Sequence, residues 1–245
     1  MSTLDLPEGS VDLIILVGVL EHIYDLEISL KKLWKFLSNN GKIFITVPDA
    51  SQYFRGTDAP YQEFSLEHIN YFGPISLTNL MERNDFVHME SKQTLLEVHH
   101  GTITPVLHSI YQKSADGNKG IIRNDIITTP NLIKYIDKSR NEDFILKQKI
   151  EKIVESEQPI IIWGTGAQLL RLLETTKIGM SKIVAYVDSN PKYLGKTLRG
   201  VMIICPEALQ GMTEAILISS RGFQSEIIKQ IRIKLKLNNE IITLF

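Results

Sequence analysis

The chain has 245 residues, of which 43% are hydrophobic and 22% charged, a composition typical of one or two folded globular domains and unlike that of disordered chains. Its 27 Lys and Arg residues balance 28 Asp and Glu residues, so no overall positive field indicates a nucleic acid or an anionic membrane as partner. The single cysteine, Cys205, excludes an internal disulfide and a cysteine-based zinc site and favours a cytoplasmic location.

The first predicted element is a strand at Val11 to Leu20 (VDLIILVGVL), a continuous apolar run rich in β-branched residues. This pattern is typical of a strand that is buried on both faces of a parallel sheet. The run is too short for the roughly 20 residues of a membrane-spanning helix, and Met1 to Ser10 has no signal-peptide pattern. We therefore expect no membrane partner.

The next residues predict a helix, a strand and a long loop. Leu26 to Leu37 has apolar residues at helical spacing and is followed by Asn39-Asn40-Gly41, which stops a helix. Lys42 to Val47 (KIFITV) predicts a strand, closed by Pro48. Asp49 to Leu66 is a loop of a length that is usually functional or mobile.

The middle of the chain is less regular. Pro74 starts a short predicted helix, and Phe86 to Val98 predicts one or two strands. Gly101 to Thr129 has no clear pattern. Pro130 to Glu157 alternates charged and apolar residues, which predicts a helical bridge of one helix, or of two with a break near Ser139.

From residue 158 onward, predicted strands and helices alternate with short connections. Such alternation is typical of a parallel, doubly wound sheet with right-handed crossovers. We therefore divide the chain into a domain at 1–129, a helical linker at 130–157 and a C-terminal domain at 158–245. The predicted strands of the last domain are Ile160–Trp163, Ile183–Val187, Val201–Ile204, Ala215–Ser219 and Ile241–Phe245, and its helices are Ala167–Lys177, one from Pro206, and Ser225–Leu235.

A glycine motif follows the first strand of the C-terminal domain. Gly164 and Gly166 lie between a strand and a helix, and Asp188 ends the next strand, which is the setting of a dinucleotide-binding loop. The glycines let a phosphate approach the helix N-terminus, and the carboxylate could accept hydrogen bonds from a ribose. Leu169 replaces the third glycine. The alternatives are binding of a nucleotide, nucleotide-sugar or NAD, and a simple tight turn at the glycines, with Asp188 as the cap of the turn at Asp188–Pro191.

Three stretches of the N-terminal domain resemble class I S-adenosylmethionine-dependent methyltransferases. Leu6–Ile15 with Val19–Ile23 is similar to the family's fourth strand and the turn after it, Gly41–Pro48 to its fifth strand, and Phe64–Gly73 to the segment before its last helix. The resemblance implies S-adenosylmethionine as cofactor and places beside it Val19, Leu20, Glu21 and His22. The alternative is an ordinary strand-to-helix turn with Asp25 as the helix cap.

The C-terminal domain is similar to the Rossmann-like domain of sugar C-methyltransferases, on the residues Ile161–Gly166, Val187–Pro191, Gly195-Lys196 and Cys205–Glu207. Together the resemblances imply a partial methyltransferase-type sheet followed by a Rossmann-like doubly wound sheet. They imply that the pair Glu67-His68 transfers a proton on a nucleotide-linked keto-sugar. Two residues before the glutamate, where the family has tyrosine, this chain has Ser65.

The proposed proton transfer is chemically reasonable. Methyl transfer to carbon requires a carbanion-like nucleophile. An imidazole is the side chain best suited to removing the proton, which makes His68 the candidate base. Glu67 could orient the ring, and Tyr71 could donate a hydrogen bond to the developing oxyanion. The alternative is a helix cap beside a surface histidine. We expect no metal site at His99-His100 or His108, because no nearby carboxylate or cysteine completes a ligand set.

In family order, the glycine-rich cofactor loop should precede residue 1, so we expect the chain to lack the cofactor-binding half of the catalytic domain. The Val11–Leu20 strand would then present an open apolar edge, which a homodimer or a partner chain should cover. Three functions stay open: a methyltransferase acting on a nucleotide-linked sugar or glycan precursor, a nucleotide or nucleotide-sugar binding module, and a structural subunit.

Overall fold

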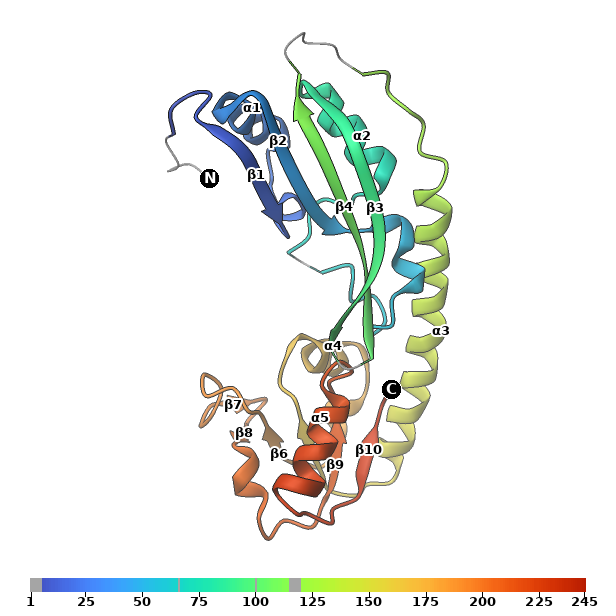
Figure 1. The fold of residues 1–245 in the computed structure, drawn as a ribbon. Helices are drawn as coiled ribbons and strands as arrows, with labels where there is room; N and C mark the ends of the chain where they lie inside the picture. The colour runs from blue at the N-terminus through green and yellow to red at the C-terminus, as the bar shows by residue number, and fades with distance from the viewer. Residues whose placement is uncertain (1–5, 66, 100, 115–119) are drawn as a thin grey trace. The chain divides into compact units, whose positions relative to one another are not determined.

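The computed structural model describes residues 6–65, 67–99, 101–114 and 120–245. The chain folds into two compact α/β units, which confirms the predicted fold class (Figure 1). Unit 1 comprises Met1–Thr57, Tyr61–Glu97 and Ile103–Lys138, and unit 2 comprises Asp58–Pro60, Val98–Thr102 and Ser139–Phe245. His100 and the side chain of His99 lie outside the described part.

Unit 1 is built on a four-stranded sheet in the order β1-β2-β4-β3. β1 and β2 pair in parallel, with Ile14 opposite Ile43, and β2 pairs with β4 antiparallel. The first predicted strand thus lies in a sheet with a parallel neighbour, as its sequence pattern predicted. The elements are β1 (Val11–Val17), η1 (Leu20–His22), α1 (Leu26–Phe36), β2 (Leu37–Pro48), η2 (Ala50–Arg55), α2 (Pro74–Arg83), β3 (Phe86–His99) and β4 (Thr102–Lys113).

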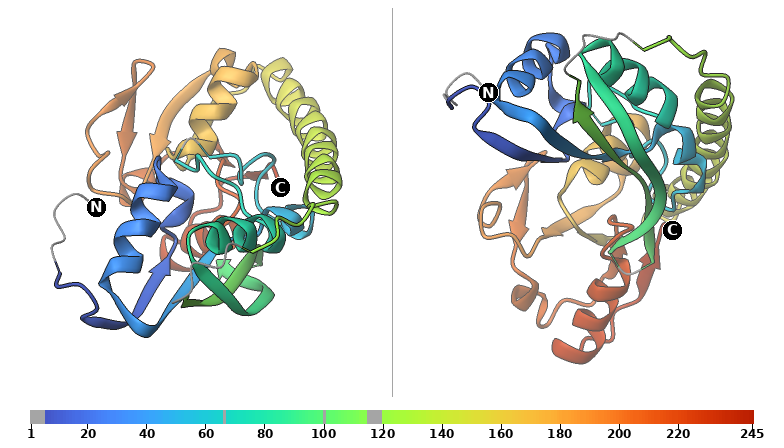
Figure 2. Two further views of the ribbon diagram at one scale, coloured as in Figure 1. Left: turned by 90° about the horizontal axis from the view of Figure 1, so that it is seen from above. Right: turned by 45° about the horizontal axis from the view of Figure 1, so that its top comes forward.

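The helices α1 and α2 of unit 1 pack on the sheet through one hydrophobic core (Figure 2). Leu30 and Leu33 of α1 and Leu77 and Met81 of α2 share this core with residues of β1, β2 and β4. The helix α1 begins where the Asp25 side chain accepts a hydrogen bond from the Ile28 amide, a standard N-cap. The predicted cap at Asp25 is therefore confirmed.

Burial of the first strand on both faces was a wrong prediction. Leu13, Ile15 and Val17 are 53%, 60% and 61% exposed, whereas Leu16 between them is buried in the core. β1 is an edge strand with β2 as its one neighbour in the sheet, and alternate side chains of a strand point to opposite faces. Within unit 1 the core covers one of these faces.

The stretch without a clear sequence pattern contains a strand of unit 1. β4 lies between β2 and β3 and pairs with β2 from Lys42–Gln112 to Pro48–Val106. His108 on this strand contacts Thr46 and Thr94 through its two ring nitrogens, at 3.2 Å and 2.8 Å. Both nitrogens are thus engaged in cross-strand hydrogen bonds.

Unit 2 contains a six-stranded sheet in the order β10-β9-β5-β6-β8-β7. Five of these strands are parallel, and they lie side by side in the order β8, β6, β5, β9, β10. Numbered by their place along the chain, this is the order 3-2-1-4-5 of a doubly wound sheet. This confirms the predicted topology. The elements are β5 (Ile160–Trp163), α4 (Ala167–Thr175), η3 (Ile178–Met180), β6 (Ile183–Val187), β7 (Thr197–Leu198), β8 (Val201–Ile204), η4 (Pro206–Leu209), β9 (Ala215–Ile218), α5 (Gln224–Lys229), η5 (Gln230–Lys234) and β10 (Ile241–Thr243).

One helix, α3 (Thr128–Glu155), passes from unit 1 into unit 2. It is continuous through Ser139, so the version of the prediction with a single helix is correct. Among the described residues, none of the helices combines the length and the apolar character that a membrane span requires.

Candidate functional site

The turn after β1 is the first candidate site. Gly18 leaves the strand with φ +63°, a left-handed conformation that glycine adopts without a steric cost. The turn η1 follows. Its first residue, Leu20, belongs to the core of unit 1, and Val19 before it packs against that core. Of the four residues expected beside the cofactor, Glu21 and His22 are thus the ones with polar side chains at this turn.

The segment containing the predicted catalytic pair is fixed to this turn by hydrogen bonds. The amides of Ile69 and Asn70 donate to the carbonyl of Glu21 at 2.9 Å and 3.1 Å. The Asn70 side chain donates to the carbonyls of Leu20 and Ile23 at 3.2 Å and 2.7 Å. These contacts join two segments that lie far apart in the sequence and set the position of the residues before Asn70.

Glu21, His22 and His68 converge as a result. The rings of His22 and His68 lie 4.9 Å apart, edge to face, and one potential ligand atom from each of the three side chains lies within 4.8 Å of the other two. Glu21 is 3% exposed. Its Oε2 atom and His68 Nδ1 are buried without a hydrogen-bond partner among the described residues. Buried polar atoms are usually paired, so these two atoms could bind a ligand.

The other two predicted catalytic residues lie differently. The Ser65 side chain accepts hydrogen bonds from the amides of Glu67 and His68 at 3.2 Å and 3.3 Å, and the carbonyl of Glu67 accepts one from His22 Nδ1 at 2.8 Å. The Glu67 side chain is exposed. Glu21, which the resemblance places beside the cofactor, is therefore the buried carboxylate next to the half-buried His68.

Tyr71 belongs to a group of aromatic rings. It packs edge to face on Tyr53 and Phe64, with ring centroids 6.5 Å and 5.7 Å apart. Burial raises the pKa of the Tyr71 phenol, so this group stays protonated at neutral pH and can donate a hydrogen bond. No hydrogen bond or ring contact within the described residues joins Tyr71 to His68.

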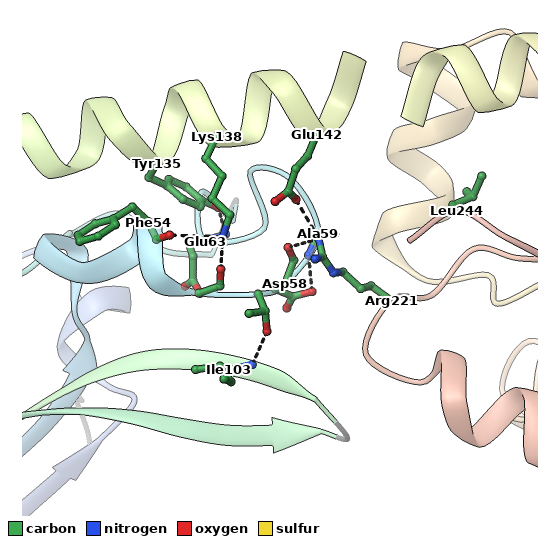
Figure 3. A network of polar contacts seen from close by, with 12 residues as sticks. Phe54, Asp58, Ala59, Glu63, Ile103, Tyr135, Lys138, Glu142, Arg221 and Leu244 are labelled. Carbon is green, nitrogen blue, oxygen red and sulfur yellow. Dashed lines mark hydrogen bonds and ion pairs between the residues drawn. The ribbon is translucent and has the colours of Figure 1, made fainter. Parts of the chain in front are cut away.

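The predicted long loop is held by helix α3 (Figure 3). Lys138 donates hydrogen bonds to the carbonyls of Phe54 and Gly56, and the Tyr135 hydroxyl accepts one from the Glu63 amide at 3.0 Å. Part of this loop forms the short helix η2. The loop is therefore ordered by contacts on both of its halves.

Asp49, directly after β2, is fully buried. Its carboxylate accepts hydrogen bonds from the Ser51 amide and hydroxyl at 3.0 Å and 2.6 Å, and from the Gln93 side chain at 2.6 Å. Burial raises the pKa of the Asp49 carboxyl, and the nearby charge of Asp125 adds to this shift, although the hydrogen bonds from Ser51 and Gln93 oppose it. Sequence reasoning did not single out Asp49, which resembles any polar residue at the start of a loop.

The glycine turn of unit 2 forms the second candidate site. Gly164 has φ +105°, and a Cβ atom there would lie 2.8 Å from Ser219 Oγ. The carboxylate of Asp188 accepts hydrogen bonds from the Thr165 amide at 2.9 Å and from the Thr165 hydroxyl, and its other oxygen accepts one from the Asn190 amide at 2.8 Å. Asp188 thus caps both turns, as one of the two sequence alternatives stated.

Gly166 differs from Gly164. Its φ of −75° suits any residue, and a Cβ atom at this position would have nothing within 4 Å. It is the N-cap of α4, without a side-chain hydrogen bond at that end. In a doubly wound sheet, ligands bind outside the carboxyl ends of the strands where the strand order reverses, here between β5 and β9.

Two family models match parts of the chain. Residues 3–91 match the methyltransferase domain, and residues 156–242 match the N-terminal domain described as C2185-like. No curated protein matches the chain. The N-terminal part of the protein is therefore methyltransferase-like.

Two solved methyltransferases are similar to the chain. A SAM-dependent methyltransferase from Methanosarcina mazei has 16% identity and a TM-score of 0.36, with 46% of this chain and 64% of that protein covered. The 1,6-didemethyltoxoflavin-N1-methyltransferase of Burkholderia thailandensis, solved with bound 1,6-didemethyltoxoflavin and S-adenosylhomocysteine, has 19% identity and a TM-score of 0.36, with 46% of this chain and 48% of that protein covered. The match spans less than two thirds of either protein, and such TM-scores do not by themselves define a fold.

Proposed function

We propose that the protein is an S-adenosylmethionine-dependent methyltransferase in which unit 1 acts on a nucleotide-linked sugar or another glycan precursor. The observation that supports this proposal is the placement of His68 against the turn after β1, within the range that matches the methyltransferase domain. S-adenosylmethionine supplies the methyl group when bound. Glu21 offers a buried carboxylate oxygen without a protein partner, which suits a ribose or amino group of this donor.

The residues of unit 1 have separate roles in this proposal. His68 removes the proton next to the acceptor carbonyl, and Tyr71, whose hydroxyl stays protonated, donates a hydrogen bond to the oxyanion that forms. Glu67 presents its carbonyl to His22 Nδ1 and so keeps the second imidazole in one orientation beside His68. Loss of a general base typically lowers a rate by about 100- to 10,000-fold.

Calorimetry on the full chain with S-adenosylhomocysteine tests donor binding, and a dissociation constant in the micromolar range would support the proposal. With a nucleotide-linked keto-sugar as acceptor, His68→Gln should lower methyl transfer by about 100-fold or more. His88→Gln is the matched control, because His88 contacts Ser91 on β3 and lies outside this group. The proposal fails if the donor product does not bind, or if both variants retain full activity.

A second candidate function belongs to unit 2, where we propose that a nucleotide, nucleotide-sugar or NAD binds at Gly164, Gly166 and Asp188. The open space at Gly166, at the N-terminus of α4, favours this candidate. Calorimetry with UDP and with NAD checks it, and Gly166→Asp should abolish the binding. An absence of heat with both ligands contradicts this candidate.

We also propose that a second copy of the chain, or a partner chain, covers the open edge of β1. The exposed Leu13, Ile15 and Val17 support this proposal, because apolar edge strands associate unless they are protected. Light scattering should give a dimer or a larger complex, and Ile15→Lys should shift it to the monomer. A wild-type monomer, together with rapid hydrogen exchange along β1, contradicts the proposal.

A further inference from the structure

We propose that Glu21, His22 and His68 form a binding site for a divalent transition metal ion, with zinc as the favoured ion. Two imidazoles and one carboxylate are a known zinc ligand set, which leaves a fourth position for an oxygen of water or of a substrate. The three side chains come from two segments, the turn η1 and the residues before α2.

The spacing of the three groups suits this assignment after a small side-chain adjustment. Their potential ligand atoms lie within 4.8 Å of one another. Around a tetrahedral zinc ion with bonds of about 2.1 Å, two ligand atoms are about 3.4 Å apart. Rotation about the side-chain bonds of Glu21 and the two histidines is enough to close this difference, and the backbone can stay in place.

The hydrogen bonds around the three residues select the atoms that would bind the ion. His22 Nδ1 lies 2.8 Å from the carbonyl of Glu67, and a carbonyl only accepts, so this nitrogen carries the proton. The lone pair of a neutral His22 is therefore on Nε2. Such a contact behind a ligand fixes the tautomer and orientation of metal-binding histidines.

Two atoms without a hydrogen-bond partner indicate a ligand, independently of the spacing. Glu21 Oε2 and His68 Nδ1 are both buried and have no hydrogen-bond partner in the described part of the chain. A buried carboxylate oxygen without a partner is costly, because its loss of hydration is not compensated. A cation between Glu21 and the two rings would compensate this charge. His22 is exposed and provides the side from which an ion enters.

The described histidines elsewhere in unit 1 have other partners. His108 contacts Thr46 and Thr94, and His88 contacts Ser91. These two side chains therefore serve as internal references for a histidine that is held by protein contacts alone.

The inference does not depend on methyl transfer, because metal binding is measured without donor or acceptor. The two roles of His68 compete, however. A ring nitrogen that binds zinc cannot accept a proton, so zinc should inhibit any reaction in which His68 is the base. A failure to bind metal leaves the proposed methyltransferase untouched, and an absence of methyl transfer leaves the metal site untouched.

Titration of the full chain with Zn²⁺ and with Co²⁺ tests the site. We expect one ion per chain, and visible Co²⁺ absorption of the intensity typical of four-coordinate sites. His22→Gln, His68→Gln and Glu21→Gln should each weaken binding by roughly 100-fold, at least as much as the loss of a group that supports a ligand. His88→Gln should bind as the wild type does.

Circular dichroism and urea unfolding identify any variant that fails to fold, and the folded variants then decide. Glu21→Gln keeps the size of the side chain, and His22→Gln keeps a donor for the Glu67 carbonyl, so both should fold. The inference is overturned if the wild-type chain binds neither ion, or if the folded variants bind zinc as tightly as the wild type.

Discussion

The two units make similar glycine turns, but the carboxylates at these turns differ in their hydrogen bonds. In each unit a glycine with positive φ ends the first strand of a parallel pair, Gly18 after β1 and Gly164 after β5. In unit 2, both oxygens of Asp188 accept hydrogen bonds from the turn itself. In unit 1, Oε2 of the buried Glu21 has no partner among the described residues. A carboxylate beside a glycine turn can therefore have both oxygens engaged by the turn, or keep one oxygen without a protein partner.

The largest expected change in stability comes from replacing the carboxylates at the two turns. Asp188→Ala removes the acceptor of the Thr165 amide, the Thr165 hydroxyl and the Asn190 amide, and should lower the free energy of unfolding by about 2 to 4 kcal/mol. Glu21→Gln, which removes a charge that lacks a partner, should leave that free energy unchanged or raise it. Urea unfolding followed by circular dichroism measures both. Equal losses in the two variants would remove the distinction between the turns.

A second prediction concerns the glycines of unit 2. Gly164→Ala should cost roughly 2 kcal/mol of stability, because φ is +105° and the new Cβ atom would meet Ser219 Oγ at 2.8 Å. Gly166→Ala should change stability by less than about 0.5 kcal/mol, since its backbone suits alanine and the space is open. Thermal unfolding of both variants checks this. A similar loss in both would show that Gly166 is also needed for the turn.

The smallest effect is the pH dependence from Asp49, a buried carboxyl of unit 1 that does have partners. Its raised pKa means that the folded chain holds this proton more tightly than the unfolded chain. The resulting stabilisation is complete below the usual value of 3.8 and is lost as the pH rises through the higher pKa of the folded state. Unfolding free energies of the wild type and Asp49→Asn across this range should diverge, with the wild type losing stability. A constant difference contradicts this.

Much of the fold follows from local sequence pattern. In unit 2, the alternation of strands and helices predicted the five parallel strands and the helices between them, because each element there has a clear period and short connections. In unit 1, the helix α1 and its Asp25 cap were equally clear. The strand β4 was missed because its polar residues, such as His108, make their hydrogen bonds with neighbouring strands.

The candidate site was only partly predictable. The sequence suggested Glu21 and His22 on one side and Glu67-His68 on the other, each from its own segment. Their meeting depends on hydrogen bonds from Ile69 and Asn70 to the Glu21 carbonyl, and no spacing pattern in the sequence encodes contacts at such separation. The sequence therefore identified the residues, while the tertiary structure joined Glu21 to His68 in place of Glu67.

By itself, the sequence determined most of the strands and helices, with β4 as an exception, and which glycines make turns, because these properties depend on residues that are close along the chain. The tertiary structure alone decided how the strands are used. Leu13–Val17 and Ile160–Trp163 are both continuous apolar runs, yet β1 is a largely exposed edge and β5 is buried throughout. The physical reason is that burial depends on the neighbours a strand acquires: β5 pairs with β6 and β9, whereas β1 pairs with β2.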